Sequence, residues 1–360
     1  MDAFPLPRHA VPTPALLLDR AALMRNIAAM AAFAEAQGVE LRPHAKTHKS
    51  AEIARRQIAA GAVGICCAKL AEAEALAEGG VGDIHLTSSV VAPGAIHRLA
   101  GLNRRIALST VVDHPDNARA LGAGIDGLTV FIDVDPGSHR TGVTSAAAAV
   151  ELAQVIAATG TLKLGGVQFY CGSHQHIQSL AERRAAIVER TDYLRAVLDA
   201  LRAAGFYVPI VTGAGTGTFA IDASLGVFTE LQVGSYIFLD REYLDCELAG
   251  PRFEPALFVD ATVVSANTPG MVTIDAGLKA FATDAGAPVV LGGAPAGSRY
   301  AFTGDEHGAL FGDDLPGLGA RVTLMPPHCD PTVNLYDRYQ LLDGDNVVEA
   351  WPVTARGRST

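Results

Sequence analysis

Short apolar runs alternate with longer runs rich in alanine and leucine from about residue 15 to residue 240. The long runs repeat apolar residues with the period of about 3.6 residues that amphipathic helices show, and they include residues 51–60, 70–77, 146–158 and 180–204. The short runs have the composition of buried strands. Eight strands are predicted in this way: Val39–His44, Gly64–Ala68, Asp83–Ser88, Arg105–Val112, Leu128–Val134, Leu164–Phe169, Ile210–Thr212 and Thr229–Tyr236.

This alternation predicts an α/β fold with a parallel sheet, because parallel strands need connections of helical length. Eight repeats favour closure into a (β/α)8 TIM-type barrel, in which chemistry gathers at the carboxyl ends of the strands. An open, doubly wound sheet is the alternative that the same pattern allows.

The pattern changes after residues 250–251 (Gly-Pro). Valine- and threonine-rich segments then alternate with turn signals, which predicts a compact β domain; these segments are 261–265, 271–274, 321–325 and 347–353. We therefore expect a barrel over residues 15–245 and a β domain over residues 246–360. Residues 1–14 are expected to pack on the β domain.

Composition excludes several classes of protein. With 49% hydrophobic and 18% charged residues, the chain can build a core and is not of the disordered type. No apolar run approaches the length of a membrane span, and the first residues lack the layout of a signal peptide. The net charge of −10, spread along the chain, argues against nucleic-acid or anionic-membrane partners. Five cysteines without scaffold spacing indicate reduced thiols and a cytoplasmic protein.

Three cations and two histidines lie within nine residues, from Leu41 to Lys49. The first barrel strand runs into this stretch, so Lys46 is expected at the barrel mouth. Neighbouring cations and partial burial lower the pKa of an ammonium group, which yields the free amine that a nucleophile needs. A solvated basic loop is the alternative reading.

A second stretch, Gly213–Thr218, has the spacing G-x-G-x-G at the end of another predicted strand. Backbone N–H groups of such a loop can bind a phosphate, although the spacing is neither that of a Walker loop nor that of a dinucleotide fold. A glycine-rich turn without a ligand is the alternative. Together, a reactive lysine and a phosphate loop at one barrel mouth indicate pyridoxal 5′-phosphate (PLP), bound as a Schiff base.

The sequence resembles the D-threonine aldolase and D-serine dehydratase family, PLP enzymes of the alanine-racemase-like fold. The motifs that carry the resemblance are R-P-H-A-K-T-H-K at 42–49, the loop at 213–218 and P-H-C-D-P-T at 327–332, with further matches at 65–67, 305–308 and 351–357. The resemblance implies a PLP barrel followed by a β domain, in agreement with the pattern above. It also implies a head-to-tail homodimer with sites shared across the interface.

The resemblance further implies roles for individual residues. Lys46 would bind PLP covalently, and the residues expected to contact the cofactor beside it are Arg140, Gln168, Tyr170, Thr212, Gly215, Thr216, Gly217 and Tyr236. Among the remaining histidines, His85 is expected in a loop or on the surface, whereas His174 and His176 could line the mouth.

His328, Cys329 and Asp330 offer three possible metal ligands in a row. On a strand, His328 and Asp330 would share one face and Cys329 would point away. This N/O pair suits Mn²⁺, Mg²⁺, Co²⁺ or Zn²⁺. The resemblance implies that a His-x-Asp pair accompanies aldolases that use harder ions, so Mn²⁺ is expected, whereas a His-x-Cys pair accompanies zinc-dependent dehydration. A turn in which His328 only ends a strand is the alternative.

The resemblance therefore implies a lyase: a PLP- and metal-dependent aldolase that cleaves small D-β-hydroxy-α-amino acids, D-threonine for example, to glycine and an aldehyde. Lys46, His44 and His328 are the expected catalytic residues, and either His44 or a water on the metal would take the proton of the β-hydroxyl. The alternatives left open are a D-3-hydroxyaspartate aldolase, a dehydratase of D-serine or 3-hydroxyaspartate, and a non-catalytic PLP carrier.

Overall fold

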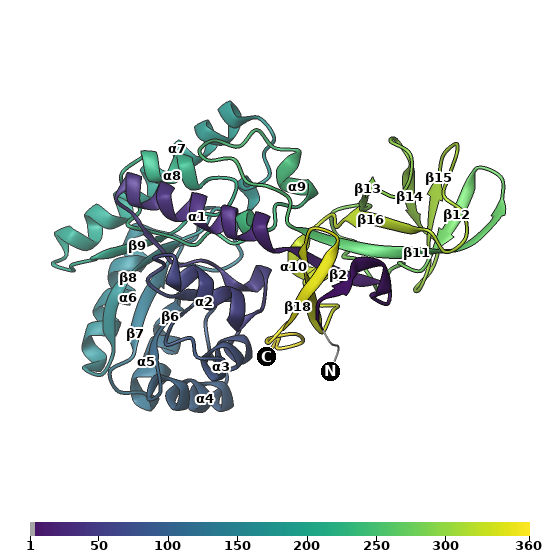
Figure 1. The fold of residues 1–360 in the computed structure, drawn as a ribbon. Helices are drawn as coiled ribbons and strands as arrows, with labels where there is room; N and C mark the ends of the chain where they lie inside the picture. Colours follow the sequence, from purple (N-terminus) through teal and green to yellow (C-terminus); the bar gives the residue numbers. More distant parts are fainter. Residues whose placement is uncertain (1–3) are drawn as a thin grey trace.

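The computed structural model describes residues 4–360. A helix-covered barrel lies on one side and a β domain on the other, and the long strand β11 (Leu257–Thr268) leads from the barrel side into the β domain (Figure 1). No helix in the described part of the chain combines the length and the apolar character needed to cross a membrane.

The barrel confirms the predicted alternation. Within residues 4–360 its sheet has eight strands, all paired in parallel: β3 (Glu40–Leu41), β4 (Ile65–Cys67), β5 (Asp83–Leu86), β6 (Ala107–Val112), β7 (Thr129–Asp133), β8 (Lys163–Phe169), β9 (Ile210–Gly213) and β10 (Glu230–Leu231). The order runs from β3 through β10, β9, β8, β7, β6 and β5 to β4. A parallel bridge between His44 and Cys66 joins the two ends of this order. The sheet is thus a closed barrel, and the open doubly wound alternative is wrong.

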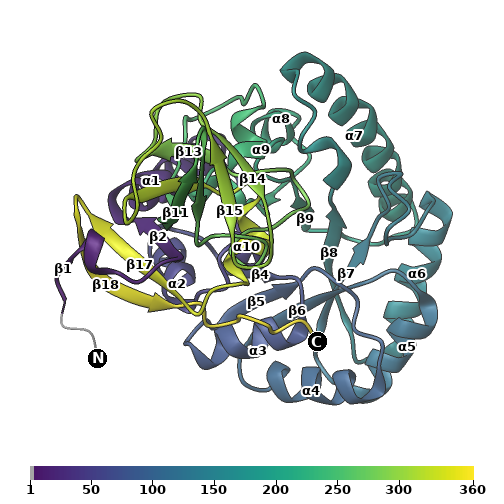
Figure 2. The same ribbon diagram turned by 90° about the vertical axis from the view of Figure 1, so that its right-hand side faces the viewer.

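Helices cover the outside of the barrel: α1 (Arg20–Gln37), α2 (Ala51–Ala59), α3 (Leu70–Glu78), α4 (Pro93–Asn103), α5 (Pro115–Gly124), α6 (Ala146–Thr159), α7 (Leu180–Ala203) and α8 (Phe219–Ser224) (Figure 2). The four helices predicted from periodicity, α2, α3, α6 and α7, agree with the structure to within one residue at each end. Local chemistry fixes the ends: the Ser145 and Ser179 side chains accept from the first turns of α6 and α7, and Gly160 ends α6 in a left-handed conformation.

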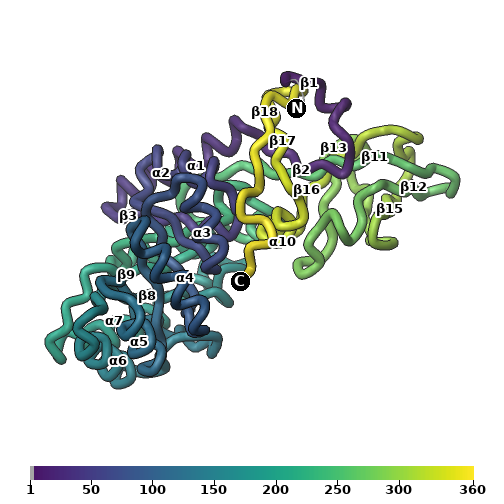
Figure 3. The backbone as a smooth tube through the Cα atoms, turned by 90° about the horizontal axis from the view of Figure 1, so that it is seen from below, coloured from purple at the N-terminus to yellow at the C-terminus, as the bar shows by residue number. Residues whose placement is uncertain are grey.

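The β domain is built on a ten-stranded sheet. Its strands are β1 (Leu6–Pro7), β2 (Ala15–Asp19), β11, β12 (Met271–Ile274), β13 (Val289–Gly292), β14 (Arg299–Phe302), β15 (Gly308–Phe311), β16 (Arg321–Met325), β17 (Arg338–Asp343) and β18 (Asn346–Pro352). The short helix α9 (Arg241–Leu244) ends the barrel side, and α10 (Cys329–Val333) lies at the junction with the β domain. Figure 3 shows the hairpin β17–β18 between the barrel helices and the rest of the β domain.

The barrel does not begin at residue 15 as expected. Residues 15–19 form β2, which pairs antiparallel with β11 and parallel with β17 in the β domain. Leu16, Leu17 and Leu18 are all buried there, because a central strand is covered on both faces. Ahead of it, β1 pairs with β18, while residues 1–3 of the expected N-terminal segment lie outside the described residues. The chain therefore enters the barrel only with α1.

Candidate active site

A cavity of about 230 Å³ opens at the carboxyl ends of the barrel strands. Residues from nearly every strand end line it: His44, Lys46, Ala68, Thr87, Ser88, Arg140, Thr141, Gln168, Tyr170, Gly215, Thr216, Gln232, Gly234, Ser235 and Tyr243. The structure thus brings together most of the cofactor-contact residues that the sequence indicated. Thr212, Gly217 and Tyr236 are not among the lining residues.

Lys46 lies in a single turn of 3₁₀ helix, Ala45–Thr47, directly after the first barrel strand. Its Nζ is 3.9 Å from Asp330 Oδ2 and 5.7 Å from the centre of the Tyr170 ring. The amine therefore projects into the cavity from the barrel and meets a carboxylate that comes from α10.

The other cations of the 41–49 cluster have partners of their own. Arg42 donates to Asp83 (2.5 Å) and Glu230 (2.9 Å), and Lys49 Nζ lies 3.5 Å from the buried Glu72. The charges of Arg42 and Lys49 are thus neutralised by carboxylates outside the cavity. They do not lower the pKa of Lys46 in the way that their closeness in the sequence suggested.

The predicted lowering of the Lys46 pKa is wrong. Burial lowers the pKa of Lys46, but its interactions with Tyr170 and Asp330 outweigh this effect and that of the Arg140 cation, so the pKa is raised above its ordinary 10.5. In this arrangement Lys46 is an ammonium group paired with Asp330.

His44 is buried beneath the cavity, with both ring nitrogens engaged. Its Nδ1 accepts the backbone N–H of Lys46 (3.3 Å), so the ring proton is on Nε2, which lies 3.1 Å from Thr87 Oγ1. Burial, followed by the charge of Lys46, holds the pKa of His44 well below 6.5. A neutral ring without a free lone pair is not suited to accept a proton from the substrate, and this geometry weighs against His44 as the base.

The glycine-rich loop after β9 lies tightly against Gln175. A Cβ on Gly215 would lie 2.5 Å from the Gln175 side chain, and one on Gly217 would lie 1.9 Å from its carbonyl oxygen. The Gly217 N–H already donates to Gln175 Oε1 (3.0 Å). Only Gly215 and Thr216 of this loop face the cavity, so a phosphate there would be contacted by them rather than by Gly217.

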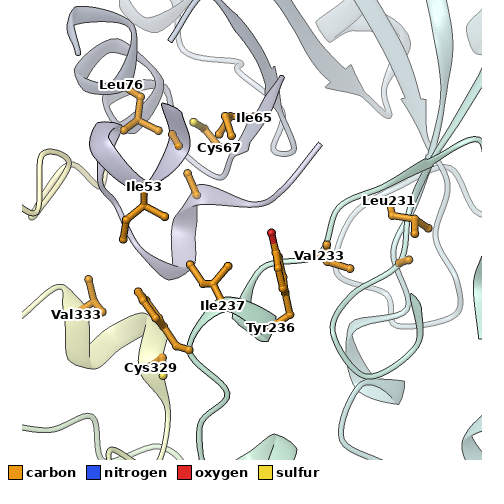
Figure 4. Packing of buried hydrophobic residues seen from close by; sticks show 14 of the residues in the cluster. Ile53, Ile65, Cys67, Leu76, Leu231, Val233, Tyr236, Ile237, Cys329 and Val333 are labelled. Atoms are coloured by element: carbon orange, nitrogen blue, oxygen red, sulfur yellow. The ribbon is translucent and has the colours of Figure 1, made fainter. Parts of the chain in front are cut away.

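Two of the expected contact residues point their side chains elsewhere. The Tyr236 hydroxyl accepts from Gln57 Nε2 (3.0 Å), and its ring packs in the hydrophobic cluster shown in Figure 4. Its backbone N–H donates to Thr216 Oγ1 (3.0 Å). Thr212 is fully buried and donates to Glu230 Oε1 (2.7 Å). Both side chains therefore lie outside the cavity and are hydrogen-bonded to other side chains.

Gln168 forms part of the cavity floor and is held by two buried side chains. Its Nε2 donates to Asp133 Oδ1 (2.9 Å), and its Oε1 lies 3.2 Å from His85 Nε2. The expectation that His85 lies in a loop or on the surface is therefore wrong. His85 lies on β5 and points into the barrel. Burial lowers the pKa of His85 to about 3.

Arg140 reaches the cavity from a loop that a single carboxylate organises. The buried Asp135 accepts the N–H groups of Gly137, Ser138 and His139 through Oδ1 at 2.9, 2.9 and 3.0 Å. Among residues 4–360, no carboxylate forms an ion pair with Arg140, whose guanidinium carbon lies 5.6 Å from the centre of the Tyr170 ring. This cation is thus available to an anionic ligand.

The stretch from His328 to Asp330 is not a strand. The preceding strand β16 ends at Met325, and α10 begins at Cys329. The strand ends there because Pro326 and Pro327 have no backbone N–H groups to donate to a neighbouring strand. His328 is extended and its Nδ1 lies 2.7 Å from Asp284 Oδ2.

Cys329 nevertheless points away from the cavity. It is fully buried in the hydrophobic cluster with Ile237 and Val333 (Figure 4), and its N–H donates to Asp240 Oδ2 (2.8 Å). The start of a helix, rather than alternation along a strand, separates the thiol from Asp330.

No group of three or more His, Cys, Asp or Glu residues within 4–360 is arranged to hold a metal ion. His328 and Asp330 do lie close enough for the Asp330 charge to act on the ring: burial lowers the pKa of His328, but Asp330 and Asp284 raise it above its ordinary value. One imidazole and one carboxylate form a donor set that fits a divalent ion completed by water or substrate.

Two further residues near the mouth, Glu242 and Tyr243, carried no sequence signal. Tyr243 lines the cavity, its ring centre 4.7 Å from that of His176, and His176 Nδ1 is 4.0 Å from Glu242 Oε1. Burial lowers the pKa of His176, which also responds to the charges of His328 and Lys46. His176 was expected at the mouth; it is not among the residues that line the cavity, but its ring packs against Tyr243, which does line it. Glu242 and Tyr243 lie in the short α9, which has no motif.

Comparison with known proteins places this geometry in context. The family described as "Alanine racemase, N-terminal domain" matches residues 18–242, and that described as "Putative serine dehydratase domain" matches residues 256–342. D-threonine aldolase of an Arthrobacter species is 40% identical over 98% of this chain and 95% of its own length. The 3-hydroxy-D-aspartate aldolase of Paracoccus denitrificans (strain Pd 1222) is 38% identical over 97% and 93%. The solved structure of D-threonine aldolase from Filomicrobium marinum is 39% identical, with a TM-score of 0.96 over 99% of both chains.

Proposed function

Because the chain belongs to the D-threonine aldolase family, within the alanine-racemase-like fold, we propose that it is a PLP- and metal-dependent lyase. It cleaves D-β-hydroxy-α-amino acids, with D-threonine as the representative substrate, to glycine and an aldehyde. The observation that carries the proposal is the meeting of Lys46 with Asp330 at 3.9 Å. This contact brings the nucleophile Lys46 of the barrel next to the carboxylate of Asp330 from the β domain. Arg140, which has no ion-pair partner among the described residues, lines the same cavity.

The cavity residues fit PLP. Lys46 would hold its aldehyde carbon, while Gly215, Thr216 and Ser235, which line the same cavity, would contact the phosphate. When bound, PLP supplies the electron sink that cleavage of a Cα–Cβ bond requires. Arg140 would bind a carboxylate of the amino acid and orient it over Tyr170.

His328 and Asp330 would hold the metal ion, and Mn²⁺ remains the ion we expect from the His-x-Asp pair. When bound, the ion supplies a Lewis acid that lowers the pKa of the β-hydroxyl. Cys329 stays outside the ligand set because its thiol lies in the hydrophobic cluster and its burial raises the thiol pKa well above 9.

We propose His176, in place of His44, as the residue that accepts the β-hydroxyl proton. Burial lowers its pKa, so the ring is neutral at physiological pH. It also lies at the mouth beside Tyr243, within electrostatic range of both Lys46 and Asp330. His44 instead positions Lys46 through the backbone hydrogen bond described above.

His176→Gln should lower kcat by about 10²–10⁴-fold, the usual range for losing a general base. Because the base must be neutral and its pKa lies below 6.5, wild-type kcat should fall as pH decreases through that pKa, and this acidic limb should disappear in the variant. The pH profile of kcat measures both effects. His174→Gln, two residues away and with a side chain that contacts the Ser173 hydroxyl, should keep the wild-type profile. Unchanged turnover and an unchanged limb in His176→Gln would exclude this role.

Cleavage of D-3-hydroxyaspartate is a second candidate activity, and the 38% identity to the 3-hydroxy-D-aspartate aldolase of Paracoccus denitrificans over 97% of this chain favours it. A dehydratase of D-serine or 3-hydroxyaspartate uses the same cofactors but releases ammonia and a 2-oxo acid. Product analysis tests the proposal: D-threonine should give glycine and acetaldehyde, and not 2-oxobutanoate and ammonia. A higher kcat/KM for D-3-hydroxyaspartate than for D-threonine would establish the second candidate as the main activity.

We also propose, from the family resemblance, that the protein acts as a homodimer in the cytoplasm. Light scattering on the PLP-loaded protein would test the oligomeric state, and twice the monomer mass is the expected result.

A further inference from the structure

The loop between β12 and β13 is docked on α10 by specific hydrogen bonds. The Ala282 N–H donates to Thr332 Oγ1 (3.0 Å), and the Tyr336 hydroxyl donates to the Ala280 carbonyl (3.0 Å). Thr332 Oγ1 in turn donates to the His328 carbonyl (2.7 Å) and is fully buried. The loop is therefore fixed relative to the backbone of His328.

This docking delivers Asp284 to the His328 ring. Asp284 Oδ2 is 2.7 Å from His328 Nδ1, a normal distance for a hydrogen bond to a carboxylate. Glu242 Oε2, at 3.8 Å, is too far from the same nitrogen to replace it. The contact assigns the Nδ1 proton to the Asp284 side and leaves the lone pair on Nε2.

An incidental surface ion pair does not account for this arrangement. Exposed pairs between flexible side chains contribute about 0–1 kcal/mol and need no fixed backbone. Here one hydrogen bond to the buried Thr332 of α10 and another from Tyr336, which follows α10, hold the loop in place, and its residue Phe281 is itself buried. Metal-binding histidines commonly donate their second ring N–H to a carboxylate, which fixes both tautomer and ring orientation.

We propose that Asp284 is a positioning residue for the divalent ion: it holds His328 with Nε2 as the metal-binding nitrogen. This inference rests on the proposed His328–Asp330 ligand pair. Asp284 lies between β12 and β13 of the β domain, to which both ligands also belong, whereas Lys46 belongs to the barrel. The β domain thus supplies the residues of the proposed metal site, and the barrel supplies those of the PLP site.

The test is Mn²⁺ binding to PLP-loaded protein from which a chelator has removed metal, measured by calorimetry. Asp284→Ala should weaken Mn²⁺ binding by about 10–100-fold, the range for losing such a partner. Asp284→Asn should lose less, because the amide oxygen can still accept from Nδ1–H. The visible absorbance of PLP should not change in either variant, since the barrel binds the cofactor. Asp313→Ala, an exposed carboxylate of the same domain, is the matched control and should bind Mn²⁺ like the wild type.

Two results would overturn the inference. Asp284→Ala with wild-type Mn²⁺ affinity would show that the carboxylate has no role at the metal site. Asp284→Ala with a loss as complete as that of His328→Ala would show that Asp284 is itself a ligand. Wild-type Mn²⁺ affinity in His328→Ala has a different meaning, because it would refute the proposed ligand pair and, with it, this inference.

Discussion

Lys46→Ala should abolish the visible absorbance of the bound cofactor and lower turnover by more than about 10³-fold, the scale seen when a covalent catalytic group is removed. Lys46 is the lysine that lines the cavity at the barrel mouth, where its amine faces Tyr170 and Asp330. Alanine cannot form the covalent bond to PLP, and no neighbouring side chain replaces its reach. Absorbance spectra and steady-state rates with D-threonine measure the two effects.

The control for this prediction is Lys163→Ala, which changes an exposed lysine at the start of β8 and should leave spectrum and rate unchanged. Lys49 and Lys69 are the competing candidates. Lys49 is paired with Glu72, and Lys69 is the residue that precedes α3. A borohydride-reducible PLP adduct on either of them in Lys46→Ala would show that the nucleophile has been assigned to the wrong residue.

Asp330→Ala should leave a coloured but inactive protein. Loss of one of two protein ligands should weaken Mn²⁺ binding by more than about 100-fold, beyond the range attributed to partners of ligands. PLP should remain bound, because Lys46 and the Gly215–Thr216 loop belong to the barrel. The pKa of Lys46 should also decrease, because Asp330 raises it in the wild type. Partial recovery of activity at high Mn²⁺ concentration is the result to measure.

Cys329→Ala is the informative counterpart of this variant. Its thiol is buried in the hydrophobic cluster, so we expect a loss of about 1 kcal/mol in the free energy of unfolding but little change in activity or Mn²⁺ affinity. The reverse pattern, an active Asp330→Ala and a metal-free Cys329→Ala, would assign the ligands to His328 and Cys329. It would move the protein toward the zinc-dependent dehydratases.

The barrel could be predicted because its strands and helices are marked by local signals. A buried strand needs a short β-branched or apolar run, and helices such as α6 and α7 begin at a serine whose side chain accepts from the first turn. The position of Lys46 at the barrel mouth could be predicted because it follows a recognisable strand, and active-site residues of parallel barrels lie at the carboxyl ends of the strands.

The remaining features depend on long-range packing, which local patterns do not encode. The run of residues 15–18 reads like a barrel strand, but its partners β11 and β17 lie more than 200 residues away. Tyr236 follows a strand end like Lys46, yet its ring packs toward Gln57 because the turn Ser235–Ile237 rotates it into the core. Asp284 sits in a loop without a motif, and only the docking of that loop on α10 reveals its contact with His328.

The expected lowering of the Lys46 pKa failed for a related reason. A sequence shows that Arg42 and Lys49 are near Lys46 in the chain, but not that Glu230 and Glu72 neutralise them in space. The residues that raise the pKa of Lys46 are Tyr170 and Asp330, and both are more than 100 positions away along the chain.

Product analysis of D-threonine turnover, with and without a chelator, tests the proposed aldolase activity and its dependence on metal. We expect equal amounts of glycine and acetaldehyde from D-threonine, none from L-threonine, loss of the reaction with chelator and its return on addition of Mn²⁺. Formation of 2-oxobutanoate and ammonia, or full activity after complete removal of metal, would contradict this proposal.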